Sequence, residues 1–559
     1  MHRGVPEGEY DQIRRLTRQS YRAHNSRLER HINPTSGLRI EAVPTDHMDS
    51  GITADLILYN ANVITLELER PRAEMVAIEG SRVLAVGSND DLSLFKGAGT
   101  KLSDCGGGTV VPGFNDAHCH PIAHAISVLS VDCSPKAVKD IADIQARIRY
   151  RAAQTSEGKW IRAAYYDEFH LQERRPPNRW ELDQAAPRHP VVLVHSTGQS
   201  CVLNSLALRL AGITRDTPAI HRDPETCEPD GLIPGRNEQV ARAIPPWDEE
   251  DLEEGMKLVN REYLSHGITS LHDTSWTNGL RHWQLWQRFI ERGIVSSRVS
   301  MLVGTEFLDE FQRVGLLMGS GGNRLRVGGM KLALDESSGC PHPPQEDINR
   351  LALQACEAGF PVAFHVSDIP ILEASLAAIK FVCQQVPEAE HRFRLEHCPI
   401  CPPGLLLRLR ASRAIVVTQP SLLYCLGQRY QEDVSPDQTG WLWPIGSFRR
   451  FGVKVAFSSD SPLVTSNPLI GLYAAVTRQT ETGQKLAPQE GISALEALRM
   501  YTMGGAHASF EEGVKGSIRP GKLADLVVLN GDPTQSVAEQ PGDLRVVQTI
   551  IDGKVVWES

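Results

Sequence analysis

The sequence predicts an α/β fold in which a (β/α)8 TIM-type barrel is joined to a small β-sandwich domain. Short apolar segments alternate with helical ones through the middle of the 559-residue chain, as in a parallel sheet covered by helices. The apolar segments number eight, which is the number of strands that closes such a barrel. Both ends of the chain are instead rich in strand-forming residues, which indicates a separate β domain.

The eight apolar segments are the expected strands of a barrel domain over residues 113–513. They lie at residues 110–115, 268–272, 298–303, 327–334, 361–365, 393–397, 414–418 and 454–458. The first and second segments are too far apart for a single connecting helix. We therefore expect an inserted cap over about residues 135–245.

Residues 54–112 and 514–559 are expected to build the β-sandwich together. Both stretches contain short apolar runs separated by turn residues, and Asp552-Gly553 is a typical hairpin turn. Residues 1–53 form a polar extension, and its arginine-rich part could be a helix that lies on the body or on a partner subunit. A homo-oligomer held by this arm is therefore a hypothesis.

Composition disfavours several functional classes. The net charge of −10 argues against nucleic acid and anionic membranes as main partners. No apolar run is long enough to span a bilayer, and the N-terminus lacks the apolar core of a secretion signal. The 11 cysteines show no disulfide-like spacing, which suits a reducing compartment. We expect a cytoplasmic protein that acts on a small molecule.

Histidines follow the first expected strand in a pattern that suits a metal. Alternate residues of a strand share a face, so His118 and His120 point the same way and Cys119 points away. Further polar residues fall on or just after later strands: Lys331, His365, His397 and Asp460. Because the active site of such a barrel lies at the carboxyl ends of its strands, their joint placement predicts a metal site.

Six motifs together resemble the amidohydrolase superfamily, in its YtcJ-like branch, which includes N-substituted formamide deformylase. They are Pro112-Gly-Phe-Asn-Asp-Ala-His-Cys-His, Gly267-Ile-Thr-Ser-Leu-His-Asp, Met330-Lys-Leu, Arg394-Leu-Glu-His, Ser459-Asp-Ser-Pro and Gly521-Lys-Leu-Ala-Asp-Leu-Val-Val-Leu. The similarity runs from about residue 54 to the C-terminus and does not cover the N-terminal extension.

The resemblance implies a barrel that holds one or two divalent ions, usually zinc. The implied ligands are His118, His120 and Asp460 for the more buried ion, and His365 and His397 for the outer one. Lys331 would be carboxylated by carbon dioxide and bridge the two ions, because a carbamate is an anionic oxygen ligand whereas an ammonium repels a metal.

The implied reaction is hydrolysis of a non-peptide C–N bond, such as that of an amide or an N-substituted formamide. A metal-activated hydroxide would attack the carbonyl carbon. Asp460 would accept the water proton and pass it to the leaving nitrogen.

Residues of the insert are the candidates for substrate binding, namely Tyr166, His195, Gln199 and Asn204. Packing within the insert is an equally good interpretation of each. His272 is expected to lie behind the ligands. Glu396, which precedes His397, is expected to face the helices, because neighbouring strand residues point to opposite sides.

Other functions stay open from the sequence. One is a mononuclear deaminase of the same superfamily, in which Asp368 could be taken for a catalytic carboxylate, although Lys331 is typical of two-metal sites. A lactone or ester hydrolase would use the same hydroxide. A non-catalytic assembly protein is a further alternative, but such proteins usually lose ligands and all six positions are kept here.

Overall fold

The computed structural model describes residues 53–559, except 199, 219, 236–237, 337–340, 388–390 and 538–541. The extension expected over residues 1–53 therefore lies almost entirely outside the described residues. The described chain falls into two compact units. One unit comprises the residues up to 119 together with 263–459 and 467–559, and the other comprises 120–262 with 460–466.

A parallel eight-stranded sheet is the centre of the first unit. Along the sheet its strands are β22 (Lys454–Phe457), β21 (Ile415–Thr418), β20 (Arg394–His397), β19 (Val362–Val366), β16 (Leu325–Leu332), β15 (Arg298–Gly304), β14 (Ile268–Asp273) and β8 (Phe114–Cys119). The first and last strands, β8 and β22, also contact each other. The sheet is thus barrel-like and nearly closed, as the count of eight strands predicts.

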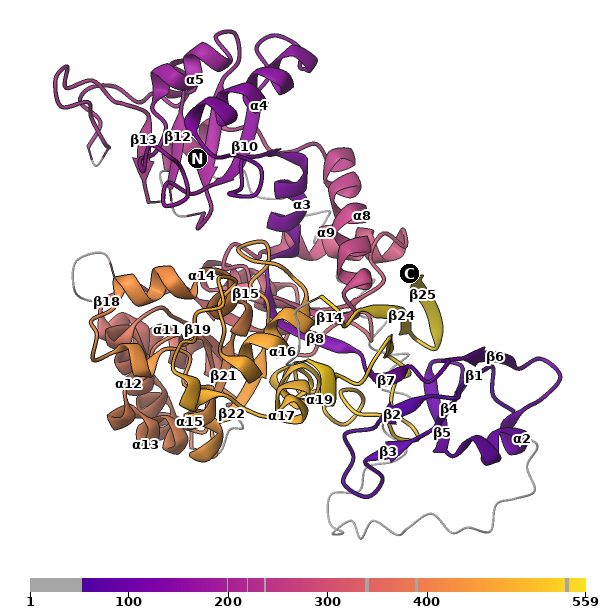
Figure 1. Cartoon of the computed structure of the whole chain (residues 1–559). Helices are drawn as coiled ribbons and strands as arrows, with labels where there is room; N and C mark the ends of the chain where they lie inside the picture. Colours follow the sequence, from indigo (N-terminus) through magenta and orange to yellow (C-terminus); the bar gives the residue numbers. More distant parts are fainter. Residues whose placement is uncertain are drawn as a thin grey trace. The chain divides into compact units, whose positions relative to one another are not determined.

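Helices follow the strands and cover the outside of this sheet, as Figure 1 shows for α11, α12 and α13. The longer ones are α9 (Leu280–Glu291), α11 (Gln345–Glu357), α12 (Ile369–Gln385), α13 (Pro403–Ser412), α14 (Pro420–Asp433) and α16 (Pro468–Thr477). The shorter ones are α10 (Leu308–Arg313), α15 (Ile445–Arg450), α17 (Ala494–Arg499) and α18 (Gly505–Ala508). The strands carry apolar residues on both faces because they are covered on both sides.

The first barrel strand begins later than predicted. Residues 110–115 were expected to be one strand, but β7 (Thr109–Pro112) belongs to a different sheet and the barrel strand starts at Phe114. Gly113 separates the two, and a Cβ atom added there would lie 2.1 Å from Thr269 Oγ1 of the neighbouring strand. Only glycine fits this close approach. The apolar run is therefore divided between two sheets.

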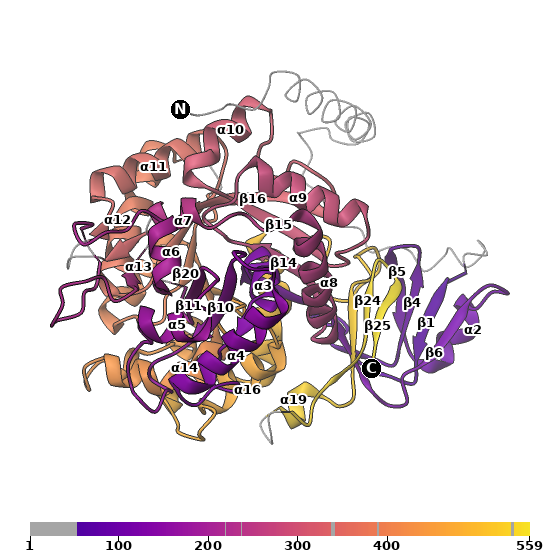
Figure 2. The ribbon, with the colours of Figure 1, turned by 90° about the horizontal axis from the view of Figure 1, so that it is seen from above.

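Both chain ends contribute to two further sheets of the first unit. A six-stranded sheet has the order β25 (Lys554–Glu558), β24 (Val546–Ile551), β23 (Leu526–Leu529), β7, β2 (Asn62–Ile64) and β3 (Arg72–Ala73). A four-stranded sheet has the order β5 (Arg82–Gly87), β4 (Met75–Glu79), β1 (Leu56–Tyr59) and β6 (Lys101–Asp104). The two sheets lie side by side (Figure 2) and share one apolar core that includes Leu58, Val76, Val110 and Leu526.

The second unit has a sheet of its own. Its five strands are β13 (Leu232–Pro234), β12 (Ser200–Leu203), β11 (Val191–His195), β10 (Ile161–Tyr166) and β9 (Val131–Asp132). Its helices include α3 (Pro121–Leu129), α4 (Ile141–Gln154), α5 (Arg179–Ala185), α6 (Ser205–Leu210) and α7 (Glu238–Ala243). Residues of α4 and α5 share a core with β10 and β11, as Ile144, Leu182 and Leu193 illustrate. None of the described helices is long and apolar enough to cross a membrane.

Candidate metal centre

Three histidine rings gather at the carboxyl ends of β8, β19 and β20. The ring centroids of His118 and His397 lie 4.5 Å apart, and those of His365 and His397 lie 4.6 Å apart. His118 is completely buried. Three imidazoles at this spacing form a nitrogen-rich donor group of the kind that transition-metal ions prefer.

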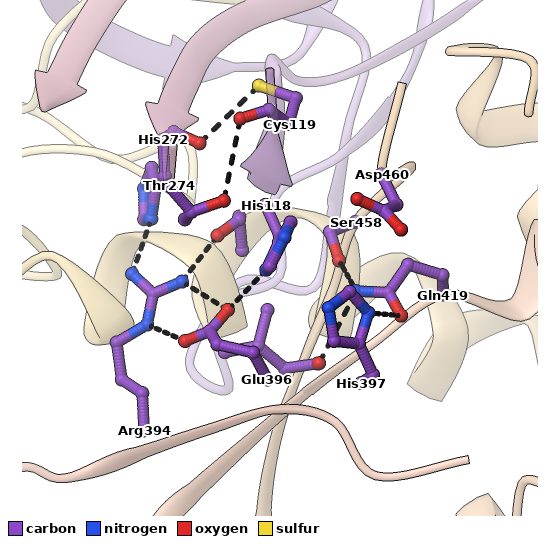
Figure 3. A network of polar contacts seen from close by, with 12 residues as sticks. His118, Cys119, His272, Thr274, Arg394, Glu396, His397, Gln419, Ser458 and Asp460 are labelled. Atoms are coloured by element: carbon purple, nitrogen blue, oxygen red, sulfur yellow. Dashed lines mark hydrogen bonds and ion pairs between the residues drawn. The ribbon is translucent and has the colours of Figure 1, made fainter. Parts of the chain in front are cut away.

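A carboxylate holds the inner histidine in place. His118 Nδ1 lies 2.6 Å from Glu396 Oε2 (Figure 3). Arg394 donates from Nε to Glu396 Oε1 at 2.7 Å and from Nη2 to Oε2 at 3.0 Å. The paired carboxylate accepts the Nδ1 proton of His118, which leaves the Nε2 lone pair for a metal. A carboxylate behind a histidine is the usual outer partner in metal sites.

His272 extends this buried chain by one more residue. Its Nδ1 lies 3.1 Å from Arg394 Nη1, and because the guanidinium can only donate, Nδ1 accepts. Burial, with Arg394 and Lys515 nearby, holds the pKa of His272 well below its usual value. The ring is therefore neutral at physiological pH. His272 is expected to lie behind the ligands. In the structure it stands at the opposite end of this row of hydrogen-bonded side chains from His118.

Glu396 was expected to face the helices, and this expectation is wrong. The residue is fully buried and contacts His118 and Arg394. The reason is that β20 ends in a backbone turn: His397 and Cys398 have φ values of 72° and 46°. Strand alternation fails at such left-handed residues, so Glu396 and His397 need not point to opposite sides.

A side-chain amide holds His397 in the same manner. Its Nδ1 lies 3.1 Å from Gln419 Oε1, and Gln419 donates from Nε2 to Ser458 Oγ at 2.9 Å (Figure 3). The bond to Ser458 orients the amide so that its oxygen faces the ring. His397 then carries its proton on Nδ1, and its lone pair is on Nε2.

Asp460 lies next to the second histidine of the first motif. Its Oδ1 is 3.2 Å from His120 Nε2. Asp460 adopts φ 61°, a conformation that a non-glycine residue keeps only where its surroundings hold it, and such residues cluster at functional sites.

Lys331 lies on β16 next to the histidine strand. It is 3% exposed and its backbone pairs with Ala363 of β19, two residues before His365. A charged ammonium group is costly to bury. A lysine buried to this degree, on a strand next to one that carries a histidine, is therefore unusual.

The substrate-binding candidates of the second unit have different environments. Gln199 lies outside the described residues. Asn204 uses its amide fully: Oδ1 accepts from the backbone of Val191 and Ala207, and Nδ2 donates to His189 O. This bonding suits the packing interpretation, because Asn204 caps α6. Tyr166 and His195 are buried side by side with ring centroids 5.2 Å apart.

Asp368, the residue that a deaminase interpretation needs, is engaged elsewhere. Its Oδ1 accepts a hydrogen bond from the backbone of Ile371 at 2.8 Å, and Ser367 Oγ donates to its Oδ2 at 2.7 Å. Asp368 is therefore the N-cap of α12. This role explains an aspartate at the start of a helix without catalysis.

Several polar residues of the site were not singled out from the sequence. Arg394 contacts Glu396 two residues along the strand and His272 of another strand, and Gln419 contacts His397 from the end of another strand. Asp116 accepts a hydrogen bond from the backbone of Ser459 at 2.9 Å and thereby ties β8 to the second residue after β22. Asp116 and Arg394 stand inside two of the motifs that resemble the family, whereas Gln419 stands in none of them.

Comparison with known proteins finds relatives that match most of the chain. The amidohydrolase family matches residues 101–557. N-substituted formamide deformylase of Arthrobacter pascens is 29% identical over 90% of this chain and 98% of its own. YtcJ of Bacillus subtilis (strain 168) is 26% identical over 90% of this chain and 99% of its own. A metal-dependent hydrolase structure from Pyrococcus furiosus superposes with a TM-score of 0.69 at 24% identity, over 86% of this chain and all of that one.

The fold is the barrel that the Pyrococcus furiosus structure shares with this chain. The chain belongs to the amidohydrolase family, and the resemblance to its YtcJ-like branch is confirmed.

Proposed function

We propose that the protein is a metal-dependent hydrolase that cleaves a non-peptide C–N bond, of an amide or an N-substituted formamide. The observation that carries this proposal is the histidine cluster itself. Two of its rings, His118 and His397, have Nδ1 held by an acceptor and so direct Nε2 to a common region. Asp460, whose Oδ1 lies 3.2 Å from His120 Nε2, offers an anionic donor for the proposed ion.

The proposed ligands of one or two divalent ions, with zinc the expected metal, are His118, His120, Lys331, His365, His397 and Asp460. Lys331 would act as its carbamate and bring one more anionic oxygen. A bound ion of this kind supplies Lewis acidity and lowers the pKa of water towards neutrality.

The side chains then have separate tasks. Asp460 accepts the proton of the attacking water and returns it to the leaving nitrogen, which balances the hydrolysis. Glu396 keeps the proton of His118 on Nδ1, and Arg394 donates to both oxygens of Glu396. Gln419 keeps the proton of His397 on Nδ1. These partners preserve the ring orientations without touching the substrate.

The formyl group is the first acyl group to test, because a deformylase is among the relatives that match this chain over most of its length. The assay is release of formate and amine from a panel of N-substituted formamides and amides by the full-length protein. We expect hydrolysis that disappears in His397→Ala and is kept in His391→Ala, since His391 is stacked on Phe393 outside the cluster. Equal rates in both variants and the wild type would remove the proposal.

We also propose a division of the chain into a composite domain at its two ends and a cap. The two sheets built from residues 54–112 and 514–559 form a composite β-sandwich, which their common core supports. The insertion that includes residues 135–245 is a cap, which its separate sheet supports. A cap predicts less proteolysis within 135–245 when a substrate analogue binds, and unchanged cleavage would contradict it.

The cytoplasm is the proposed compartment. The described cysteines are free thiols, which suits a reducing environment. Residues such as Cys133 and Cys201 have a pKa raised by burial, Cys201 to about 12, so these thiols are poor nucleophiles and are not part of the proposed chemistry.

A further inference from the structure

We propose that Glu262 is a positioning residue for the proposed metal centre, and that it fixes how His120 and Asp460 lie relative to each other. Both of these residues are proposed ligands, so the inference rests on the proposed function and deepens it. Glu262 acts through one side chain on each side. All the residues concerned lie within the second unit.

The pair to be positioned joins two separate elements. His120 Nε2 lies 3.2 Å from Asp460 Oδ1, and the backbone N–H of His120 donates to Ser461 O at 2.8 Å. His120 is the N-cap of α3, whereas Asp460 begins the segment of residues 460–466. The distance between the imidazole and the carboxylate therefore depends on how this segment lies against α3.

Glu262 contacts both of these elements. It lies in the last turn of α8 (Glu249–Ser265). Its Oε2 lies 3.3 Å from Nε2 of His124, which belongs to α3. Its Oε1 accepts a hydrogen bond from Ser466 Oγ at 2.8 Å. One carboxylate thus joins α3 to the segment, with one oxygen for each.

Together these contacts form a closed ring. The backbone N–H of His124 donates to His120 O at 2.9 Å, so the histidine that Glu262 contacts lies one helical turn from the proposed ligand. Ser466 is the last residue of the segment that Asp460 begins. The segment is therefore held at its start by His120 and at its end by Glu262.

Asp460 needs such support from its surroundings. Its φ of 61° is a left-handed backbone conformation, which is unfavourable for a residue with a side chain and persists only where neighbouring groups hold it. Ser466 is 1% and His124 8% exposed, so little water competes for the two partners of Glu262. The bridge through Glu262 is thus suited to keeping the segment, and Asp460 with it, in place.

Helix α3 is in turn held by the strand β10. Ser127 Oγ donates to His124 O at 2.7 Å, and the Tyr165 hydroxyl forms a hydrogen bond with Ser127. Burial holds the pKa of Tyr165 above its usual value, and the negative charge of Glu262 adds to this shift. The hydroxyl therefore stays protonated at neutral pH and keeps its bond to Ser127.

The test compares wild type, Glu262→Ala, Glu262→Gln and Asp183→Ala as full-length proteins. Competition with a chromophoric chelator gives the affinity for Zn2+, and formate release from an N-substituted formamide gives kcat and KM. Asp183 is the matched control, because its two oxygens accept from Ser205 N at 3.0 Å and Ser205 Oγ at 2.6 Å and so join two other elements of the same unit, α5 and α6.

We expect Glu262→Ala to lower both the Zn2+ affinity and kcat by about tenfold, the smaller end of the usual effect of removing an outer partner, with little change in KM. Glu262→Gln should recover most of the loss, because an amide can accept from the serine and donate to a neutral imidazole. Asp183→Ala should match wild type in affinity and kcat.

Wild-type Zn2+ affinity and kcat in Glu262→Ala would overturn the proposal. An equal loss in Asp183→Ala would also overturn it, because the loss would then reflect general destabilisation of the unit. If Glu262→Ala does not fold, Ser466→Ala decides: it removes only the bond to the segment and should lower the affinity, and an unchanged affinity would refute the role. The affinity is measured without substrate, so the expected zinc pattern in a protein that hydrolyses no formamide would refute the hydrolase and keep the role of Glu262.

Discussion

His118 Nδ1 lies 2.6 Å from Glu396 Oε2, and both side chains are completely buried. Arg394 contacts both oxygens of this carboxylate. The arrangement fixes which nitrogen of His118 carries the proton before any ion is bound. Glu396 is thus a positioning residue for the proposed metal centre.

Replacing Glu396 by glutamine should weaken metal binding. The amide keeps the shape of the carboxylate but loses its charge, so it no longer selects the Nδ1-protonated ring. We expect the affinity for Zn2+ to fall by about 10–100-fold, the usual effect of removing an outer partner. Competition with a chromophoric chelator measures this affinity. A Glu396→Gln protein with wild-type affinity would contradict the proposed role.

Gln419 should affect the reaction rate only by orienting the ring of His397. In Gln419→Leu the ring loses its acceptor and can turn, so we expect kcat to fall by about tenfold or more while the protein stays folded. Gln419→Glu keeps an acceptor at the same place and should recover most of the rate. A uniform loss in both variants would mean that the residue serves packing and not ring orientation.

The barrel could be predicted because its signal is local. Each strand is a short apolar run, and seven of the eight were found within about two residues of their expected bounds, the usual accuracy for element ends. The prediction failed only for the first strand, at Gly113. There one apolar run serves two sheets, and nothing in its periodicity shows that β7 pairs with β23 whereas β8 pairs with β14.

The site was predictable only in part for the same reason. His118, His365 and His397 stand at strand ends that the sequence reveals, and the structure brings their rings together. Their partners come from other strands: Gln419 follows β21, and Glu396 reaches His118 across the barrel. Such contacts depend on strand order, which a single sequence does not display.

Arg298 should contribute strongly to stability. It is 2% exposed and binds Asp525 through Nε at 2.6 Å and Nη2 at 2.9 Å, and so links the barrel strand β15 to the C-terminal sheet. In Arg298→Leu the Asp525 carboxylate would stay buried without its partner, at a cost of about 3–5 kcal/mol. Urea denaturation measures the change.

The exposed pair between Arg72 and Asp532 is the control for that measurement. Arg72 is 44% exposed, so Arg72→Leu should cost less than about 1 kcal/mol. Equal losses in Arg72→Leu and Arg298→Leu would show that burial does not decide the strength of these ion pairs.

Low pH should destabilise the fold by protonating Glu511. Burial alone would raise the pKa of this carboxyl, but Lys515 at 2.7 Å and Arg326 at 3.3 Å lower it to about 2. A depressed pKa stabilises the fold above the ordinary value of 4.5, and this contribution is lost as the pH falls from 4.5 towards 2. The shift corresponds to about 3 kcal/mol.

Glu511→Gln checks this pH dependence. The variant should be less stable than wild type at neutral pH, and the difference should shrink as the pH falls below about 4. Denaturation midpoints measured across this range test the statement. A difference that stays constant with pH would mean that the charge of Glu511 does not stabilise the fold.

The most direct test of the proposed hydrolase is the metal content of the full-length chain. Protein purified without chelator, as wild type and as Lys331→Ala, is measured by elemental analysis, and activity on N-substituted formamides is followed in parallel. We predict about two ions per wild-type chain in the catalytic barrel, fewer in Lys331→Ala, and activity that follows metal content. Wild-type protein that binds no metal at the barrel histidines, even after reconstitution with zinc and bicarbonate, would contradict the account.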